Sequence, residues 1–261
     1  MKVLRYHRDA EISYTLGATL TFELLKFRPE LMNRVFISSE TELSGGIRKL
    51  VDTCEAKHIP VEKNDKAFHI LSPKGNCYVI AEFRKEDVKL QPGNHVVLVN
   101  PSDAGNLGTI VRTMTGFGVR ELAIVRPGVD IYDPRTVRAT MGAVFHIRAE
   151  YYDTFEDYIK RFPKNRRFAF MLTGSKMLPE VIMQEQEREA RDAVEAAPFS
   201  LIFGNEATGL PDEFAETCTA VRINHSGDID SLNLPMAAGI GLYEFTKTRW
   251  NPQLFDNITL S

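Results

Sequence analysis

The chain has 261 residues, of which 43% are hydrophobic and 26% charged, so it has apolar material for one large globular domain or two. No apolar run approaches the roughly 18 residues of a membrane span, and the N-terminus lacks the apolar core of a signal peptide; together these features predict a cytoplasmic protein without a membrane partner. The formal net charge of −3 does not by itself indicate nucleic-acid binding, although a local basic patch is enough to contact phosphates.

Strand and helix patterns alternate through the first 90 residues. Helices are predicted at 19–27 and 45–57, and strands at 35–38 and 76–83. This alternation is typical of a small α/β unit. The charged, turn-prone segment 85–93 contains Pro92 and is predicted to link a domain at 1–90 to a second domain at 91–261.

From residue 95 onward, short apolar runs alternate with helical or loop segments. Five runs are predicted as strands: HVVLV (95–99), ELAIV (121–125), FAFML (168–172), SLIFG (200–204) and AVRIN (220–224). Near-continuous apolar strands of this kind indicate a parallel sheet covered by helices on both faces. A final helix is predicted at 234–250 with Pro235 in its first turn, and an exposed helix at 184–197.

Three polar or glycine-rich segments follow predicted strands, at 100–112, 204–209 and 225–233. Because ligands bind at the carboxyl ends of strands in an open parallel sheet, we expect these loops to form one site. The first loop lacks both the G-x-G-x-x-G fingerprint and the phosphate-binding P-loop, so an oxidoreductase with a nicotinamide cofactor and an NTPase are poorly supported.

Each polar residue in these loops has a structural alternative. Asn106 can be a helix N-cap, and Arg112 can be a surface ion-pair partner or a bidentate phosphate clamp. Glu206 can favour the start of a following helix or orient polar groups beside a ligand. Ser231 and Asn233 precede the final helix and can cap it; no G-x-S-x-G pattern makes the serine a hydrolase nucleophile.

Cysteines and basic residues give weaker signals. Three separated cysteines are predicted to be reduced thiols, and no cluster predicts a metal site. The densest candidate for phosphate contact lies within 160–167, with smaller basic groups at 48–49 and 84–85; a solvated surface is the alternative for each. The residues of the dense cluster are Lys160, Arg161, Lys164, Arg166 and Arg167.

Together the three loops resemble the signature motifs of the SpoU (TrmH-like) family of RNA 2′-O-ribose methyltransferases, in the SPOUT class. The motif segments are NLGTIVRTMTGFG (106–118), LIFGNEATGL (201–210) and INHSGDIDSLNLPMAAGIGLYE (223–244). The segment ATMGAVFHI (139–147) resembles a family segment between the first two motifs. The matching positions are Asn106, Gly108 and Arg112, then Gly204, Glu206 and Gly209, then Ile223, Ser231, Leu232 and Asn233.

This resemblance implies an α/β fold with a C-terminal trefoil knot, a homodimer, and S-adenosylmethionine as cofactor within the knot loops. It implies that Gly204, Ile223 and Leu232 contact the cofactor, with Thr173 and Gly174 in the same pocket. More weakly, residues 10–90 resemble the L30e-like domain of many family members. Because such domains bind structured RNA, ribosomal RNA is favoured over tRNA as the substrate.

The reaction implied is in-line attack of a ribose 2′-hydroxyl on the cofactor's methyl group. The family assigns Arg112 to this step, and we favour clamping of the adjacent phosphate because a guanidinium group is a poor base. Asn106, Glu206, Ser231 and Asn233 are expected to hold the arginine, the ribose and the cofactor. The arginine is expected to meet the cofactor across the dimer interface.

Two positions depart from the family pattern. Asn224 and His225 replace the Pro-Met that often follows the isoleucine of the third motif, which predicts an altered pocket wall. Pro235 replaces a small polar residue and is compatible with a first helical turn. A non-catalytic RNA-binding relative is the alternative to an enzyme, and retention of the polar motif residues argues against it.

Overall fold

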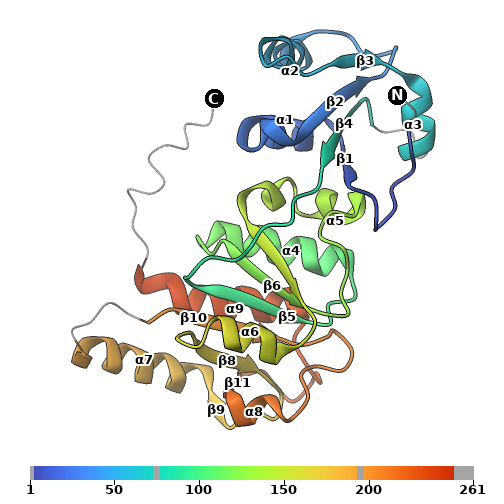
Figure 1. The fold of residues 1–261 in the computed structure, drawn as a ribbon. Helices are drawn as coiled ribbons and strands as arrows, with labels where there is room; N and C mark the ends of the chain where they lie inside the picture. The colour runs from blue at the N-terminus through green and yellow to red at the C-terminus, as the bar shows by residue number, and fades with distance from the viewer. Residues whose placement is uncertain (1–2, 73–76, 193–196, 250–261) are drawn as a thin grey trace.

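Two β-sheets, one in each half of the chain, organise the fold in Figure 1. The computed structural model describes residues 3–72, 77–192 and 197–249. The predictions that reach residues 76, 193–196 and 250 lie partly outside these residues. Residues 85–94 connect the sheets, and the predicted domain boundary after residue 90 falls in this segment.

The N-terminal sheet has four strands in the order β1-β4-β2-β3, and only β2 and β3 are parallel. Strand β1 alternates the apolar residues Ile12, Tyr14 and Leu16 with Ser13 and Thr15, and both hydroxyl residues are buried as well. The sequence analysis did not predict β1 or α3. The elements are β1 Ile12–Leu16, α1 Ala18–Phe27, η1 Pro29–Leu31, β2 Met32–Ile37, α2 Gly45–Ala56, β3 Val61–Lys63, α3 Asp65–Leu71 and β4 Val79–Arg84.

The second sheet has seven strands in the order β7-β6-β5-β10-β8-β11-β9, and all of its pairs are parallel. This agrees with the predicted parallel sheet. The two edge strands, β7 and β9, were not predicted because neither is a continuous apolar run. The strands are β5 His95–Val99, β6 Glu121–Val125, β7 Arg148–Tyr152, β8 Arg166–Phe170, β9 Lys176–Met177, β10 Phe199–Phe203 and β11 Thr219–Arg222.

Helices cover both faces of this sheet, as the apolar strands predict (Figure 1). Successive residues of β5 point to opposite faces: Val96 and Leu98 belong to one buried cluster and Val97 to the other. One face packs against α4 Ala104–Gly116, α5 Pro134–Ala139, α7 Leu178–Asp192 and α9 Leu234–Thr246. The other packs against α6 Phe155–Arg161 and α8 Phe214–Thr217. Two short 3-10 helices, η2 Ala143–His146 and η3 Lys247–Arg249, complete the described elements.

The two halves of the chain pack directly on each other. Phe83 of β4 contacts the ring of Phe145 edge-to-face at a centroid distance of 5.4 Å, inside one apolar cluster that spans both halves. Polar contacts surround it: Tyr6 and Lys85 both bind the carboxylate of Asp130, with Lys85 Nζ 3.1 Å from Oδ2. The two sheets are therefore held in a fixed relation by buried packing and paired charges.

The connecting segment is anchored as well. Glu150 Oε2 accepts a hydrogen bond from the backbone N–H of Leu90 at 2.8 Å, and Glu121 accepts one from Gln91 at 2.9 Å. None of the described helices combines the length and apolarity needed to cross a membrane. The trefoil knot and the L30e-like character of the first half stay predictions.

Candidate active site

Four loops meet at one edge of the parallel sheet, because β5, β8, β10 and β11 all end there. Helix α4 starts earlier than the sequence pattern predicts. Its N-cap is Asp103, whose carboxylate accepts a hydrogen bond from the backbone N–H of Asn106 at 2.7 Å. The capping role considered for Asn106 is therefore wrong, and its side-chain amide points to another partner.

That partner is Glu206, which joins the loop after β10 to the loop after β5. Its carboxylate accepts hydrogen bonds from the hydroxyl of Ser102 at 2.7 Å and from the Ser102 backbone at 3.1 Å. The backbone N–H of Asp103 donates at 3.2 Å and Nδ2 of Asn106 at 3.3 Å. Two motifs a hundred residues apart are thus fixed to each other by a single carboxylate.

These donors also set the charge state of Glu206. Partial burial on its own raises the pKa of the carboxyl, but the hydrogen bonds from Ser102, from the local backbone and from Asn106 outweigh burial and leave the pKa lowered. Glu206 is therefore a stably ionised acceptor and does not act as a proton donor near neutral pH.

The turn after β10 leaves no room for a side chain at Gly204. A Cβ there would lie 2.2 Å from the backbone carbon of Gly209 and 2.4 Å from the nitrogen of Leu210. Asn205, which the sequence reasoning did not single out, closes this turn by donating to the carbonyl of Asn100 at 2.8 Å and accepting from Ala207 at 2.9 Å. An Asn followed by a Gly four positions on in a strand-end turn is the signal that indicates it.

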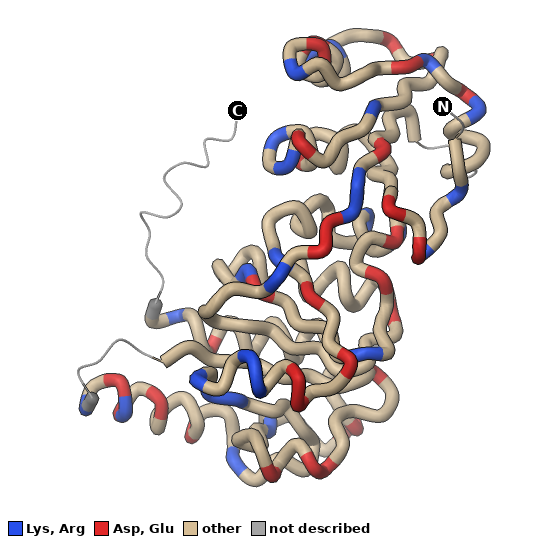
Figure 2. Tube along the Cα trace, in the orientation of Figure 1, with Lys and Arg blue, Asp and Glu red and all other residues tan. Residues whose placement is uncertain are grey.

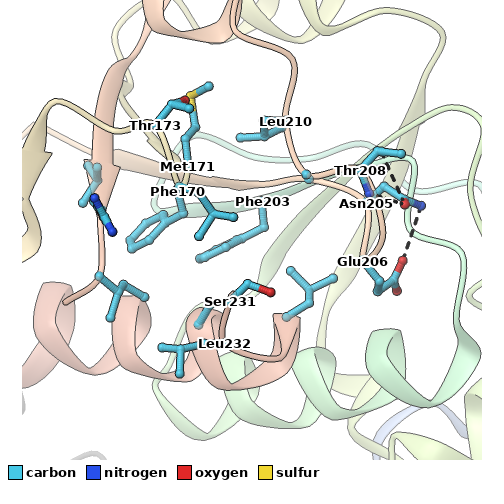
Figure 3. Close-up of a pocket in the computed structure, with 18 of the residues that line it drawn as sticks. Phe170, Met171, Thr173, Phe203, Asn205, Glu206, Thr208, Leu210, Ser231 and Leu232 are labelled. Carbon is cyan, nitrogen blue, oxygen red and sulfur yellow. Dashed lines mark hydrogen bonds between the residues drawn. The ribbon is translucent and has the colours of Figure 1, made fainter. Parts of the chain in front are cut away.

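A cavity of about 490 Å³ opens between these loops. The rings of Phe170 and Phe203 stack in its interior with centroids 4.6 Å apart, and Figure 3 shows Ser231 and Leu232 facing them from the loop before α9. The cavity has an apolar interior and a polar margin that includes Glu206, which is typical of small-molecule sites. Of the predicted site residues, those that line it are Thr173, Gly204, Glu206, Ile223, Ser231 and Leu232.

Gly174 and Asn233 were predicted at the site and do not line the cavity. A Cβ on Gly174 would lie 2.7 Å from the backbone carbon of Val221, so this glycine lets the loop after β8 pass close to β11. Asn233 occupies the N-cap position of α9 without a side-chain capping bond, and Pro235 lies in the first turn as predicted. His225 does line the cavity, in agreement with the altered pocket wall expected there.

Arg112 lies apart from this cavity. It is exposed on α4 and lines a separate surface depression with Thr109, Thr113, Gly116, Phe117 and Ala139. Gly108 lets α4 pack directly on Ala139 at this depression, because a Cβ on Gly108 would lie 2.3 Å from the Cβ of Ala139. Within one chain, the arginine of the first motif therefore does not line the cavity formed by the other two motif loops.

One known protein family matches the segment that contains the cavity and its loops. The model of the SpoU rRNA Methylase family matches residues 93–243, from the start of the parallel sheet to α9 and including all three motif loops. The chain belongs to the SpoU family.

Three curated relatives are similar to this SpoU protein. "Ribosomal RNA small subunit methyltransferase G 2" of Syntrophobacter fumaroxidans is 28% identical over 157 residues, which span 60% of this chain but 28% of that protein. The 23S rRNA (uridine(2479)-2′-O)-methyltransferase of Streptomyces viridochromogenes is 26% identical, over 80% of this chain and 74% of the relative. The tRNA (guanosine(18)-2′-O)-methyltransferase of Thermus thermophilus is 28% identical, over 64% of this chain and 80% of the relative.

A solved structure resembles this SpoU protein over both of its sheets. The AdoMet-bound rRNA methyltransferase of Sinorhizobium meliloti is 26% identical and superimposes with a TM-score of 0.72, covering 92% of this chain and 89% of that chain. The resemblance to an α/β SpoU fold, predicted from three short motifs, therefore holds for most of the chain.

Two arginines of the basic cluster predicted at 160–167 pair with carboxylates, so their charge is less available for phosphate groups. Arg161 Nη1 lies 2.6 Å from Oε1 of Glu150, and Arg166 pairs with Glu185. Arg161 ends α6, and Arg166 begins β8 at the edge of the sheet opposite the cavity. Figure 2 shows both basic and acidic residues along α6. The sequence could not indicate these ion pairs, because the acidic partners of Arg161 and Arg166 lie 11 or more residues away along the chain.

Proposed function

We propose that this SpoU protein transfers a methyl group from S-adenosylmethionine to a ribose 2′-hydroxyl of ribosomal RNA. The observation that carries the proposal is the convergence of the second and third motif loops, with Thr173, on one cavity, while Glu206 ties the first motif to that cavity. This convergence lies inside the segment matched by the SpoU model.

The cavity fits the proposed cofactor. Its volume lies in the ordinary range for small-molecule sites, and its stacked phenylalanines offer apolar contact. Gly204, Ile223 and Leu232 line it, and Thr173 lies at the margin, where its hydroxyl donates to Asp212 at 3.3 Å. We assign these residues, with Gly174 supporting the loop, to cofactor binding. When bound, the cofactor supplies an electrophilic methyl group.

The catalytic roles follow from the polar contacts. Arg112 has a planar guanidinium that is suited to clamping the phosphate next to the target ribose and so aligning the 2′-hydroxyl. Glu206 and Asn106 hold the start of α4, and with it the position of Arg112, relative to the cavity. Ser231 and Asn233, exposed on the loop before α9, are assigned to hydrogen bonds with the ribose and the cofactor.

We propose a homodimer, which the position of Arg112 supports. Because this residue lies outside the cavity of its own chain, a complete site requires the cavity of a second copy beside α4. Helix α9 packs beside α4 and exposes Met236 and Tyr243 at 62% and 52%. Large exposed apolar side chains next to the arginine depression are suited to burial in a subunit interface.

The first half of the chain is assigned as an L30e-like RNA-binding domain at 1–90, followed by a knotted catalytic domain at 91–261. Ribosomal RNA is the favoured substrate because the match to the 23S rRNA enzyme extends over 80% of this chain, whereas the match to the tRNA enzyme extends over 64%. A cytoplasmic location follows from an RNA substrate.

The test is transfer of labelled methyl from S-adenosylmethionine to unmodified ribosomal RNA and, separately, to tRNA transcripts, with mapping of ribose methylation. One ribose-methylated site in ribosomal RNA is expected. Methylation of tRNA alone would overturn the substrate. Cofactor binding without transfer to either RNA would favour an assembly intermediate as the substrate, and the absence of both binding and transfer would favour the non-catalytic relative.

A further inference from the structure

A turn at residues 139–146 connects the Arg112 depression to helix α1 of the N-terminal sheet. Ala139 lines the depression together with Arg112. Three residues later, a Cβ placed on Gly142 would lie 2.6 Å from the Cβ of Glu23, so the turn passes directly over α1. The two halves of the chain therefore present one continuous surface that starts at the arginine assigned to catalysis.

An exposed aromatic ring lies at the α1 end of this surface. Phe27 is 39% exposed, and its ring centroid lies 3.8 Å from that of His146. His146 Nε2 lies 3.0 Å from Oε2 of Glu23, one helical turn before Phe27, so the imidazole is held from two sides. Nζ of Lys26 lies over the Phe27 ring, 5.0 Å from its centroid, so a base that stacks there has to displace this flexible side chain toward a phosphate. A supported aromatic ring with a cation at hand is a surface on which RNA-binding proteins stack unpaired bases.

Met141 adds an apolar side chain in the middle of the turn. It is 49% exposed and has φ = 51°, a left-handed conformation that costs a non-glycine residue about 1 kcal/mol. The hydroxyl of Thr140 accepts a hydrogen bond from the backbone N–H of Gly142 at 3.2 Å and keeps the turn closed. Strained residues that present a side chain to solvent concentrate at functional sites.

Four cations accompany these apolar side chains. Lys26, Arg112, Arg120 and Arg138 are exposed, and no carboxylate pairs with any of them among the residues that the structure describes. Arg120 lies at the turn, where Nη1 donates to the carbonyl of His146 at 3.4 Å. In contrast to the arginines at 161 and 166, these side chains keep their charge available for phosphate groups.

We propose that this junction surface, consisting of Lys26, Phe27, Arg112, Arg120, Arg138 and Met141, binds unpaired nucleotides of the RNA next to the methylated ribose. The inference rests on the proposed function and assigns substrate recognition to both halves of the chain. The cations contact phosphates, one base stacks on Phe27, and Met141 contacts an apolar base face. Duplex RNA is excluded as the occupant because its bases are already stacked on each other.

The test measures binding of the full-length protein to the RNA that it methylates. Phe27→Ala is expected to weaken RNA affinity roughly 5- to 100-fold, the range for loss of one base–aromatic stack, while Phe27→Tyr keeps it within about threefold. Met141→Ala is expected to weaken affinity less. Met183→Ala, at an exposed methionine on α7, and Arg191→Ala, at an exposed arginine on the same helix, are the matched controls and keep wild-type affinity.

Two further readouts separate contact with RNA from a structural effect. Lys26→Ala is expected to lower the slope of log affinity against log salt concentration by about 0.7, the value for one phosphate contact on a single strand. Phe27→Ala is expected to raise KM for RNA more than it lowers kcat, with unchanged affinity for S-adenosylmethionine.

Each result decides between the two proposals. Wild-type RNA affinity in Phe27→Ala and Met141→Ala, with unchanged melting temperature and cofactor affinity, would overturn the junction surface and leave the methyltransferase assignment intact. Failure of the wild-type protein to bind or methylate any RNA would overturn the proposed function and this surface with it. Equal weakening in the matched controls would also contradict the surface.

Discussion

Gly204 shows how a single absent side chain shapes the cavity. The residue lies where the chain turns back against Gly209 and Leu210, at distances that only a hydrogen in place of Cβ allows. This tight turn places Glu206 against the loop after β5. The position of the Glu206 carboxylate thus depends on Gly204, a residue without a side chain.

We therefore expect Gly204→Ala to abolish cofactor binding and to lower the free energy of unfolding by several kcal/mol, because a Cβ would collide with backbone atoms that cannot rotate away. Isothermal titration with S-adenosylmethionine and urea unfolding measure the two effects. Gly227→Ala, where a Cβ meets nothing within 4 Å, is the control and is expected to change stability by no more than about 1 kcal/mol. Normal cofactor affinity in Gly204→Ala would contradict the cavity assignment.

Glu206 gives a prediction that depends on pH. Because its folded pKa is lowered, its contribution to stability is fully present above the unfolded value of about 4.3 and is lost as pH falls through the folded pKa. Glu206→Gln is expected to lower the free energy of unfolding by about 1 kcal/mol at pH 7 and to abolish methyl transfer. The stability difference from wild type should shrink below about pH 4.

Urea unfolding at several pH values measures this difference. Glu187→Gln, at an exposed position on α7, serves as the control without such a dependence. If the difference in free energy of unfolding between Glu206→Gln and wild type persisted unchanged at acidic pH, the ionised carboxylate of Glu206 would not be the source of the stabilisation.

The elements of the catalytic sheet were predictable to different degrees. Central strands such as β5 and β10 are buried on both faces, so their apolar runs identify them directly. Strand β1 alternates apolar and hydroxyl residues and was predictable, but the burial of its polar face was not. On that face Ser13 donates to the carbonyl of Tyr132 in the other half of the chain, and Thr15 lies 2.8 Å from Thr21. The motif loops were located correctly, whereas the start of α4 was misplaced because Asp103 was not recognised as the cap.

The basic segment that spans the end of α6 and the start of β8 yields a prediction at the element scale. Arg161→Ala removes the ion pair with Glu150 and the hydrogen bond to the carbonyl of Leu90, and is expected to lower the free energy of unfolding by about 2 kcal/mol. RNA affinity should stay within about twofold. Lys164→Ala, an exposed neighbour, should change neither quantity. Weaker RNA binding in both variants would restore this segment as a phosphate patch.

At the scale of the whole molecule, Arg112 lies outside the cavity of its own chain, which supports the proposed homodimer. The sequence resemblance predicted that Arg112 meets the cofactor across a dimer interface, but it did not indicate which face of α4 carries the arginine. That face is set by tertiary packing of α4 on α5 and α9, which no local pattern encodes.

Mixing two inactive variants tests this arrangement. Arg112→Ala and Gly204→Ala should each lack activity as homodimers, since one loses the arginine and the other the cavity. Co-expression at equal levels should restore about a quarter of wild-type activity, because half of the dimers are hybrids with one intact site of two. The measurement is methyl transfer by the purified mixture, with light scattering to confirm the dimer. No recovery in hybrid dimers, with circular dichroism showing that the Gly204→Ala subunit is folded, would place the arginine and the cavity of one chain in the same site.

The packed contact between the two halves limits which chimeras can work. A graft that joined residues 91–261 to a foreign N-terminal half would leave Asp130 without Tyr6 and Lys85, and would leave the ring of Phe145 without Phe83. Buried groups deprived of their partners cost more than the original contacts contribute. We therefore expect that substitutions at the exposed rim of this contact change the RNA target more readily than replacement of the whole N-terminal half.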